Sequence, residues 1–443
     1  MSAPLTARIA EQHASVARAL AARLPGAARR RAAMEALAAT GLPVSREENW
    51  RYANLRPLER QSFAPAALTL PADDSAARLA ADLPPGLPGF VRYVFLDGVF
   101  APGLSDALDA TPARVTPLAA RPDRPDAPPA APVPRRTPGA DQRFALLNEA
   151  FATDGAAIAV PAGAEAARLE LVFVASAEAQ LGASYPRVEL RVEAGARLVL
   201  VERHVSAGAG ASFVTSAVSA ELARGAALDH YRLQELSSRA ILFDTLGATL
   251  AQEARYRLYA IGSGAAAARS TLCVQLAGER ADLALSVAAL GDRQQVQDTY
   301  ALVEHLAPHA RTAETFRGIS AGRARVAFNG KIVVAREAHG TDSRQSLRGL
   351  LAGPEAEIDV RPQLEIYTDE VRCSHGATAG KLDDTMLFYL LSRGLDRDTA
   401  ERALKWAFLG DVIAGIELAP LRRQVEERLA GQMQDGHALR ELI

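Results

Sequence analysis

The sequence has few cysteines, few aromatic residues, no excess of either charge and no long apolar run. Its two cysteines, Cys273 and Cys373, lie a hundred residues apart in a chain of 443, which excludes a disulfide framework. Basic and acidic residues number 50 and 52, so no strong field favours nucleic acid or an anionic membrane. No apolar run reaches the ~18 to 20 residues that a membrane-spanning helix needs. We therefore expect no nucleic-acid partner, no membrane and a cytoplasmic location.

The motifs of several self-sufficient enzymes are also missing. The sequence contains no His-Glu-x-x-His or Cys-x-x-Cys, which are patterns of zinc sites and thiol chemistry. The segment 328–334, FNGKIVV, has isoleucine where a phosphate-binding loop needs serine or threonine for magnesium. The GSG at 262–264 is too short for a dinucleotide fingerprint. We expect a protein that is not an enzyme and binds no nucleotide, so that any energy from ATP comes from a partner.

Proline density and hydrophobic periodicity divide the chain into four parts. Residues 5–40 have apolar side chains at helical spacing, interrupted by Glu11 and His13, which indicates an amphipathic helix rather than a signal peptide. The segment VRYVFLDGVF alternates around Asp97-Gly98 and predicts a β-hairpin. Residues 121–139 contain seven prolines and predict an extended linker. The predicted parts are a helical region with a small hairpin (1–120), the linker (121–139), a β core (140–381) and a helical region (382–443).

A recurring pattern of alanine, any residue and a large side chain runs through the expected strands of the β core. Successive occurrences lie 27 to 32 residues apart, except for one gap of 43. Regular spacing of β segments predicts a solenoid in which each turn stacks on the next and the pattern falls at equivalent corners. A β-sandwich is the alternative. The occurrences begin at Ala167, Ala196, Ala226, Ala254, Ala281, Ala324 and Ala356.

The chain turns helical after Gly380. Asp383 or Asp384 is expected to cap a first helix that ends at Gly394. Asp396 or Asp398 should open a second helix, and a third is expected over 417–434. Aromatic residues make up only 5% of the chain but gather in the first two of these helices. They form either a packing face against the β core or a docking face for a partner; they are Phe388, Tyr389, Trp406 and Phe408.

Cys373 and His375 stand two residues apart in the stretch DEVRCSHGATAG, within an expected strand. Residues at i and i+2 of a strand point to the same face, so thiol and imidazole are presented together. This ligand pair suits iron or an iron–sulfur unit. A closed zinc site needs about four ligands, and the nearest further histidine in the sequence is His339. The pair is therefore either half of a site completed by another chain or a buried thiol beside an incidental histidine.

Several long segments carry a family resemblance. The C-terminal part contains FNGKIVV, then TDSRQSLRGLLAGPEAEIDVRPQLEIYTDEVRCSHGATAGKLDDTMLFYLLSRG, and the N-terminal part contains EENWRYANLRPL and LNEAFATDG. Together these resemble the SufB/SufD family of iron–sulfur cluster assembly proteins. The stretch around Cys373 and His375 is similar to the SufD branch, since the SufB branch has a Glu-His-Glu type stretch near this point. The resemblance covers most of the chain and is strongest over 315–412.

The resemblance implies a right-handed parallel β-helix between two helical regions. It implies a non-catalytic scaffold that pairs with SufB through its C-terminal β-helix strands and docks the ATPase SufC on its C-terminal helices. His375, with Cys373 as its neighbour, would work with a SufB cysteine at the interface where a transient iron–sulfur cluster forms. A homodimer of the isolated chain and the role of Trp50 stay open. The residues expected to bind the ATPase are Phe388, Tyr389, Arg393, Trp406 and Phe408.

Two other functions remain as alternatives. A stand-alone polysaccharide-active enzyme on a β-helix needs clustered acidic residues. Glu365, Asp369 and Glu370 are the candidates, expected in a single strand with the first two on one face. A SufB-like subunit that accepts sulfur itself would use Cys273, whose apolar flanks instead favour a buried structural thiol.

Overall fold

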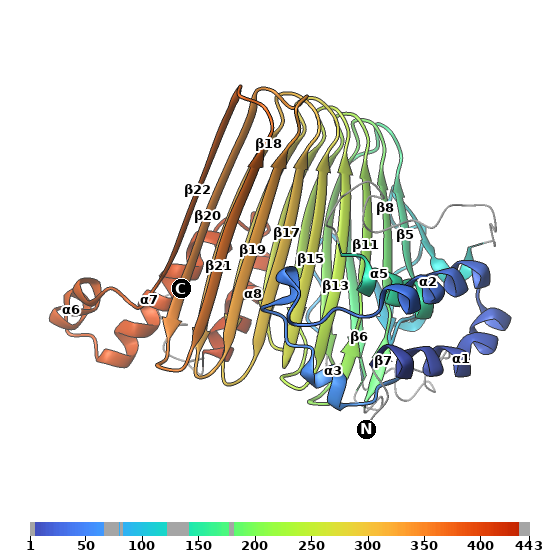
Figure 1. Cartoon of the computed structure of the whole chain (residues 1–443), viewed down its shortest axis with the longest axis horizontal. Helices are drawn as coiled ribbons and strands as arrows, with labels where there is room; N and C mark the ends of the chain where they lie inside the picture. The colour runs from blue at the N-terminus through green and yellow to red at the C-terminus, as the bar shows by residue number, and fades with distance from the viewer. Residues whose placement is uncertain (1–4, 66–78, 80–82, 122–140, 177–180, 434–443) are drawn as a thin grey trace.

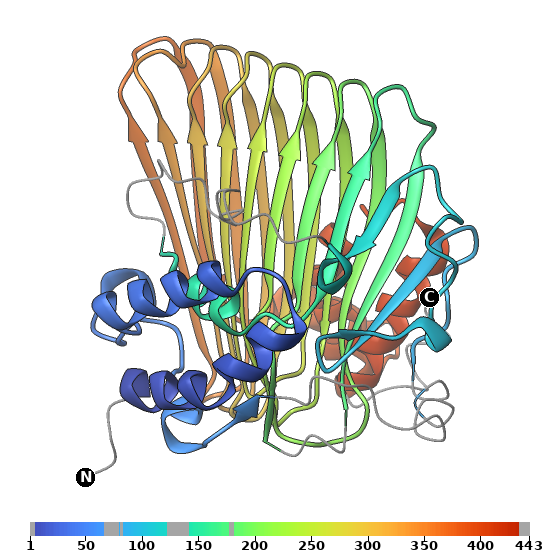
Figure 2. The ribbon, with the colours of Figure 1, turned by 90° about the vertical axis from the view of Figure 1, so that its right-hand side faces the viewer.

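Two long sheets of mainly parallel strands face each other, as Figures 1 and 2 show. The computed structural model describes residues 5–65, 79, 83–121, 141–176 and 181–433. From β5 on, the chain passes from one sheet to the other and back, so that the long strands pair in parallel with those of the preceding turn. The predicted parallel β-helix is therefore confirmed, and the β-sandwich alternative is wrong.

The first sheet has twelve strands and the second has ten. In the first sheet the main path is, in spatial order, β21 (Glu357–Ile366), β19 (Arg325–Val334), β17 (Val296–His305), β15 (Ala267–Leu276), β13 (Ile241–Leu250), β11 (Ala217–Leu222), β8 (Arg187–Val192), β5 (Gly155–Val160) and β4 (Arg114–Pro117). Three short strands join it at the side: β1 (Ala64–Pro65), β7 (Gly182–Ser184) and β10 (Ser212–Val214). The second sheet runs β22 (Val371–Gly380), β20 (Thr341–Ala352), β18 (Arg311–Ala321), β16 (Asp282–Gly291), β14 (Arg255–Ser263), β12 (Ala227–Glu235), β9 (Arg197–Ser206), β6 (Ala167–Ala175), β2 (Val91–Leu96) and β3 (Val99–Phe100).

Alternating side chains of every turn fill the space between the sheets, which we call the lumen. Leu198, Leu228, Tyr256 and Leu283 occupy one register position in four successive turns and are buried. Strands about 4.8 Å apart bring such side chains into direct contact. Burying each large apolar side chain contributes roughly 2 kcal/mol, so the stacked turns stabilise one another.

The alanine pattern marks strand beginnings in both sheets rather than one corner. The register aligns Ala196, Ala226, Ala254 and Ala281 at the start of second-sheet strands. Ala324 and Ala356 instead precede β19 and β21 of the first sheet. The gap of 43 residues is where the series changes sheet. Ala167 pairs with Leu198, two positions out of register. The prediction of a single equivalent corner is wrong, because a small residue followed by an inward side chain suits any turn that leads into a strand.

The N-terminal region covers the outer face of the first sheet (Figure 2). Its helices are α1 (Leu5–Arg23), α2 (Ala27–Thr40), η1 (Glu48–Trp50), α3 (Arg56–Arg60) and α5 (Arg143–Phe151), with two short turns η2 (Pro102–Leu104) and η3 (Leu118–Ala120). Trp50 is buried against this face, where the Arg269 guanidinium lies 4.5 Å from its ring centre. The neighbouring Glu48 reaches Arg361 of β21 at 2.5 Å. The Trp50 motif thus fastens the N-terminal region across the sheet.

The predicted hairpin at Asp97-Gly98 is confirmed, and β2 also pairs with β6 in the solenoid. Arg121 is the one residue of the predicted linker 121–139 that lies among the described residues. The rest of the proline-rich segment, and the domain boundary predicted there, lie outside the described residues.

The C-terminal helices are α6 (Asp384–Ser392), α7 (Arg397–Ile413) and α8 (Ala419–Gln432). Asp383 and Asp396 accept hydrogen bonds from the first turns of α6 and α7 as predicted, and Gly394 takes the left-handed conformation after α6 (φ 92°). The helices α7 and α8 pack on the outer face of the second sheet, where Arg317 and Asp411 form an ion pair of 3.0 Å. Figure 1 shows α6 projecting beyond the last turn.

No helix within the described ranges is both long and apolar enough to cross a membrane.

Candidate functional site

The solenoid is open at its C-terminal end. Among the described residues, β21 pairs only with β19, and β22 pairs only with β20. Each of these last strands therefore has one edge of backbone N–H and C=O groups without a strand partner, which is a template for another chain. At the other end both sheets finish in short antiparallel strands, β4 and β3. The candidate site lies at the open end.

Cys373 and His375 lie on the lumen side of β22. Cys373 pairs in register with Ser343 and His375 with Gln345, two residues that are buried in the lumen. The prediction that the pair shares one face is confirmed, and that face is the inner one. Cys373 is half-buried against the apolar core, whereas His375 is exposed because no further turn covers it. Burial and the neighbouring Asp342 raise the pKa of the Cys373 thiol, so it stays protonated at neutral pH.

Apolar side chains of β21 complete the surface around the pair. Ile358, Val360 and Leu364 are only partly buried although they continue the core. Ile366 and Tyr367, at and just after the end of β21, are exposed. An apolar surface that surrounds a cysteine and a histidine and is bordered by two strand edges without a described partner has the composition of a protein interface.

The pair by itself offers two possible metal ligands. Within the described ranges no three histidine, cysteine, aspartate or glutamate side chains are grouped so that they could hold a metal ion. A cluster or metal at this end would therefore need ligands from a second chain.

Two turns of polar side chains line the lumen beneath the pair, and sequence reasoning missed them. Thr312 and Ser343 occupy the register position of Cys373 in the two preceding turns, and Glu314 and Gln345 occupy that of His375. One turn deeper the lumen is apolar again. Polar residues on the inward face of a strand next to a leucine-filled core are the signal that could have identified them.

The acidic cluster expected of a polysaccharide-active enzyme is not formed. Strand β21 ends at Ile366, so Asp369 and Glu370 lie in the turn that follows rather than in the strand of Glu365. Glu365 forms a 2.7 Å ion pair with Lys331. The prediction of a single strand carrying all three carboxylates is wrong, because the turn between the sheets begins earlier than the alternation suggested.

Cys273 has no access to a substrate in this structure. Its side chain is buried with Tyr300 and Leu302 on the outer face of the first sheet. Burial raises its pKa to about 12, so the thiolate needed for sulfur transfer is not formed near neutral pH.

The aromatic residues of the C-terminal helices fall into two groups. On α6, Phe388 and Tyr389 are 71% and 55% exposed, and the guanidinium carbon of exposed Arg393 lies 5.1 Å from the Tyr389 ring centre. On α7, Trp406 and Phe408 are half-buried against the outer face of the second sheet. Only the first group offers a free surface.

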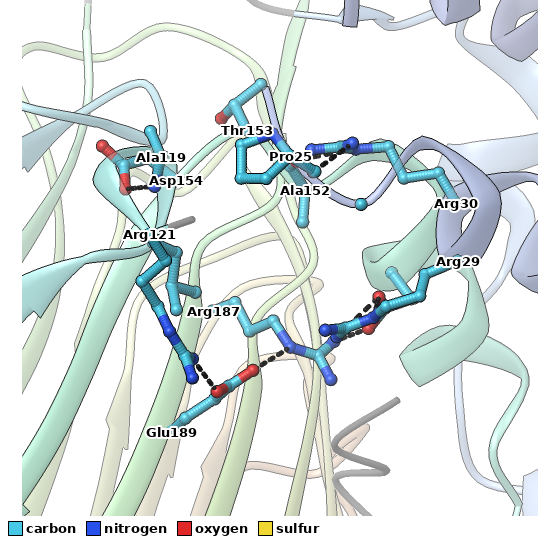
Figure 3. Close-up of a pocket in the computed structure, with 13 residues that line it drawn as sticks. Pro25, Arg29, Arg30, Ala119, Arg121, Ala152, Thr153, Asp154, Arg187 and Glu189 are labelled. Atoms are coloured by element: carbon cyan, nitrogen blue, oxygen red, sulfur yellow. Dashed lines mark hydrogen bonds and ion pairs between the residues drawn. The ribbon is translucent and has the colours of Figure 1, made fainter. Parts of the chain in front are cut away.

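A small cavity of about 110 Å³ lies between the N-terminal helices and the first sheet (Figure 3). Three of its basic side chains are paired with carboxylates: Arg187 with Glu149 at 2.6 Å, Arg29 with Glu149 at 2.9 Å and Arg121 with Glu189 at 2.5 Å. The fourth, Arg30, donates to the carbonyls of Pro25 and Ala152. These ion pairs tie the N-terminal region to the solenoid and leave the cavity a structural role.

The fold and the site define a parallel β-helix protein that presents a cysteine and a histidine at an open, interface-like end. Residues 173–408 match the family model described as SUF system FeS cluster assembly, SufBD core domain. The chain is similar to the iron-sulfur cluster assembly protein SufD of Escherichia coli K12, with 31% identity across 91% of this chain and 92% of the relative. It is also similar to a SufBD family protein of Synechocystis (29% identity, 90% and 89% covered) and to Protein ABCI7, chloroplastic, of Arabidopsis thaliana (29%, 57% and 54% covered). The chain belongs to the SufBD family of the SUF system for iron–sulfur cluster assembly.

Proposed function

We propose that this protein is the SufD-like scaffold subunit of a SUF complex. It pairs with a SufB subunit end to end through β21 and β22, and it docks the ATPase SufC on its C-terminal helices. A nascent iron–sulfur cluster, which is the cargo of the complex, forms where the two solenoids meet.

The observation that carries the proposal is the position of the ligand pair. Cys373 and His375 lie on the lumen side of the last turn, beside two strand edges that have no partner in the described chain. A partner that extends both sheets covers these edges and brings its own ligands next to His375. Since one chain offers two ligands and a cluster needs about four, the remaining ligands belong to the partner.

The chemical roles of the two side chains differ. A neutral imidazole can bind iron near pH 7 without losing a proton. The Cys373 thiol, whose pKa is raised, has to lose a proton before it can bind. His375 is therefore the principal ligand of this chain and Cys373 the supporting one. The protein orients and protects the cluster, and ATP hydrolysis belongs to SufC.

The second docking surface is the exposed face of α6. Phe388, Tyr389 and Arg393 form an aromatic and cationic group that is largely exposed. Aromatic residues and arginine dominate the binding energy of protein interfaces, which supports this face as the SufC site. Trp406 and Phe408 support α7 from beneath.

The test compares complexes purified anaerobically with the SufB and SufC homologues of the same cell. His375→Ala should leave the complex intact but abolish its iron and sulfide, because it removes the principal ligand proposed for this chain. Cys373→Ala should retain a larger share of both. Unaltered cluster content in the His375→Ala complex would contradict the proposal.

A further inference from the structure

Glu314 and Gln345 form a buried pair directly beneath His375. They occupy the same register position in the two turns that precede it, with Glu314 opposite Gln345 and Gln345 opposite His375. Neighbouring turns are about 4.8 Å apart, so the Gln345 side chain is the lumen group nearest to His375 within its sheet. Glu314 is 2% exposed and Gln345 4%.

The amide of Gln345 has a defined orientation. Its Nε2 donates to Glu314 Oε2 at 2.6 Å and to the Gly330 carbonyl at 3.1 Å. A backbone carbonyl can only accept, so the group that faces Gly330 is the NH2. Both donors are therefore used by groups other than His375.

Gly330 provides the space for this arrangement. A Cβ atom at this position would lie 2.8 Å from Gln345 Nε2 and 2.8 Å from Glu314 Oε2. The close approach of the backbone is what lets its carbonyl reach the amide.

The other end of the amide has no partner. Gln345 Oε1 is buried and accepts no hydrogen bond from any described residue. A buried acceptor without a donor is unfavourable, so it takes a donor that comes within reach. The imidazole of His375 on the next turn carries such a donor, a ring N–H.

We propose that Gln345 is a positioning residue for His375: its amide oxygen accepts the ring N–H of His375, and Glu314 with the Gly330 carbonyl holds the amide in place. The hydrogen bond fixes one tautomer, which leaves the other ring nitrogen deprotonated and directed at the open end. A histidine that binds a metal commonly donates its second nitrogen to such an acceptor. The inference rests on the proposed function of His375 and names the residues that prepare it.

The first test measures the tautomer of His375 without any metal. The isolated chain, labelled with ¹⁵N in its histidine rings, is studied by NMR, and the His375 signals are assigned by their loss in His375→Ala. The wild type should show a single tautomer. Gln345→Met, which keeps the size but removes the acceptor, should shift both ring nitrogens to the averaged values of a tautomer mixture. An unchanged tautomer ratio in Gln345→Met would overturn the proposal.

Two further variants separate positioning from a general effect on the lumen. Glu314→Gln retains an oxygen that accepts from Gln345 Nε2 and should keep the wild-type tautomer. Ser343→Ala is the matched control. Ser343 lies on β20 like Gln345, is also buried, and its hydroxyl, like the Gln345 amide oxygen, has no hydrogen-bond partner among the described residues. A tautomer shift in Ser343→Ala as large as that in Gln345→Met would contradict the proposal. If Gln345→Met does not fold, Glu314→Leu removes the support of the amide and should show the same mixture.

The second test measures iron in the complex with the SufB and SufC homologues under limiting iron. Gln345→Met should retain about tenfold less iron than Ser343→Ala, and equal retention would overturn the proposal. The two ideas fail separately. If His375→Ala keeps its cluster while Gln345→Met shifts the tautomer, the proposed function fails and the positioning stands; if His375→Ala loses its cluster and the tautomer does not respond, the positioning alone fails.

Discussion

The two ends of the solenoid differ in how their sheets finish. At the N-terminal end the sheets finish in the antiparallel strands β4 and β3, and helices cover the adjoining outer face. At the C-terminal end β21 and β22 stop with free edges, and core side chains such as Val360 and Leu364 remain partly exposed. At the first end the described residues add antiparallel strands and covering helices, and at the second end they add no strand beyond β21 and β22. Substitutions at the two ends should therefore affect different properties.

The largest expected effect on stability is at the covered outer face. Trp50→Ala removes a buried indole that contacts Phe144, Phe243 and Arg269, and should lower the free energy of unfolding by about 3 to 5 kcal/mol. Chemical denaturation monitored by circular dichroism measures this. Tyr367→Ala at the open end is the control, because its side chain is exposed, and it should change stability by no more than about 0.5 kcal/mol. Similar losses in both variants would break the comparison.

The next effect is a pH dependence produced by Glu314. Burial raises its pKa from 4.5 to about 7, so the folded protein holds the proton more tightly than the unfolded chain. The titration of Glu314 therefore adds about 3 kcal/mol to the free energy of unfolding. This contribution is fully present below pH 4.5 and is lost as the pH rises through about 7. Glu314→Gln should therefore gain stability relative to wild type between pH 5 and pH 8, as measured by urea denaturation at each pH.

The same measurement has an internal check. Burial lowers the pKa of His305 to about 4, which destabilises the fold as the pH falls below 6.5, but this is common to both proteins and cancels in their difference. A difference that is constant from pH 5 to pH 8 would contradict the assignment of the titration to Glu314.

A smaller effect is expected at α6, where binding and stability should separate. Phe388→Ala should weaken the affinity for the SufC homologue by ~2 kcal/mol or more, as for an interface anchor, and should leave the melting temperature nearly unchanged. Trp406→Ala, which removes a half-buried side chain from beneath α7, should instead lower the melting temperature. Calorimetric titration and thermal unfolding measure the two properties. If Phe388→Ala binds with wild-type affinity, α6 is not the docking surface.

The smallest effect concerns the two thiols. Because burial and Asp342 raise the pKa of Cys373, iodoacetamide at pH 8 should alkylate it more slowly than a free cysteine, while the buried Cys273 should react only after unfolding. Mass spectrometry of the intact protein and its peptides follows both sites. Alkylation of Cys273 in the native protein would show that the closed part of the solenoid opens.

Local features of the fold were predictable from the sequence. The hairpin at Asp97-Gly98, the caps at Asp383 and Asp396 and the shared face of Cys373 and His375 all depend on neighbouring residues. Features that depend on turn length were not predictable. Ala324 precedes a strand of the first sheet rather than of the second, and Asp369 lies in a turn rather than in β21. Both depend on where the preceding strands end.

The supporting part of the site was hidden for the same reason. Each of Glu314, Gln345 and His375 is separated from the next by about thirty residues, which is the length of one turn. The three side chains come together only because the turns stack. The sequence also did not reveal that Phe388 is exposed and Trp406 half-buried, because both lie in similar amphipathic helices. The difference in exposure depends on which of the two helices lies over the second sheet.

The antiparallel strands at the N-terminal end set a limit on assembly size. A solenoid with two free ends could add subunits head to tail without closing, and the product would be a filament of indefinite length. In this chain the four residues of β4 and the two of β3 run against the direction of the strands they border. The parallel pairing that joins successive turns is therefore interrupted at this end, and a further copy could not be added there by repeating it.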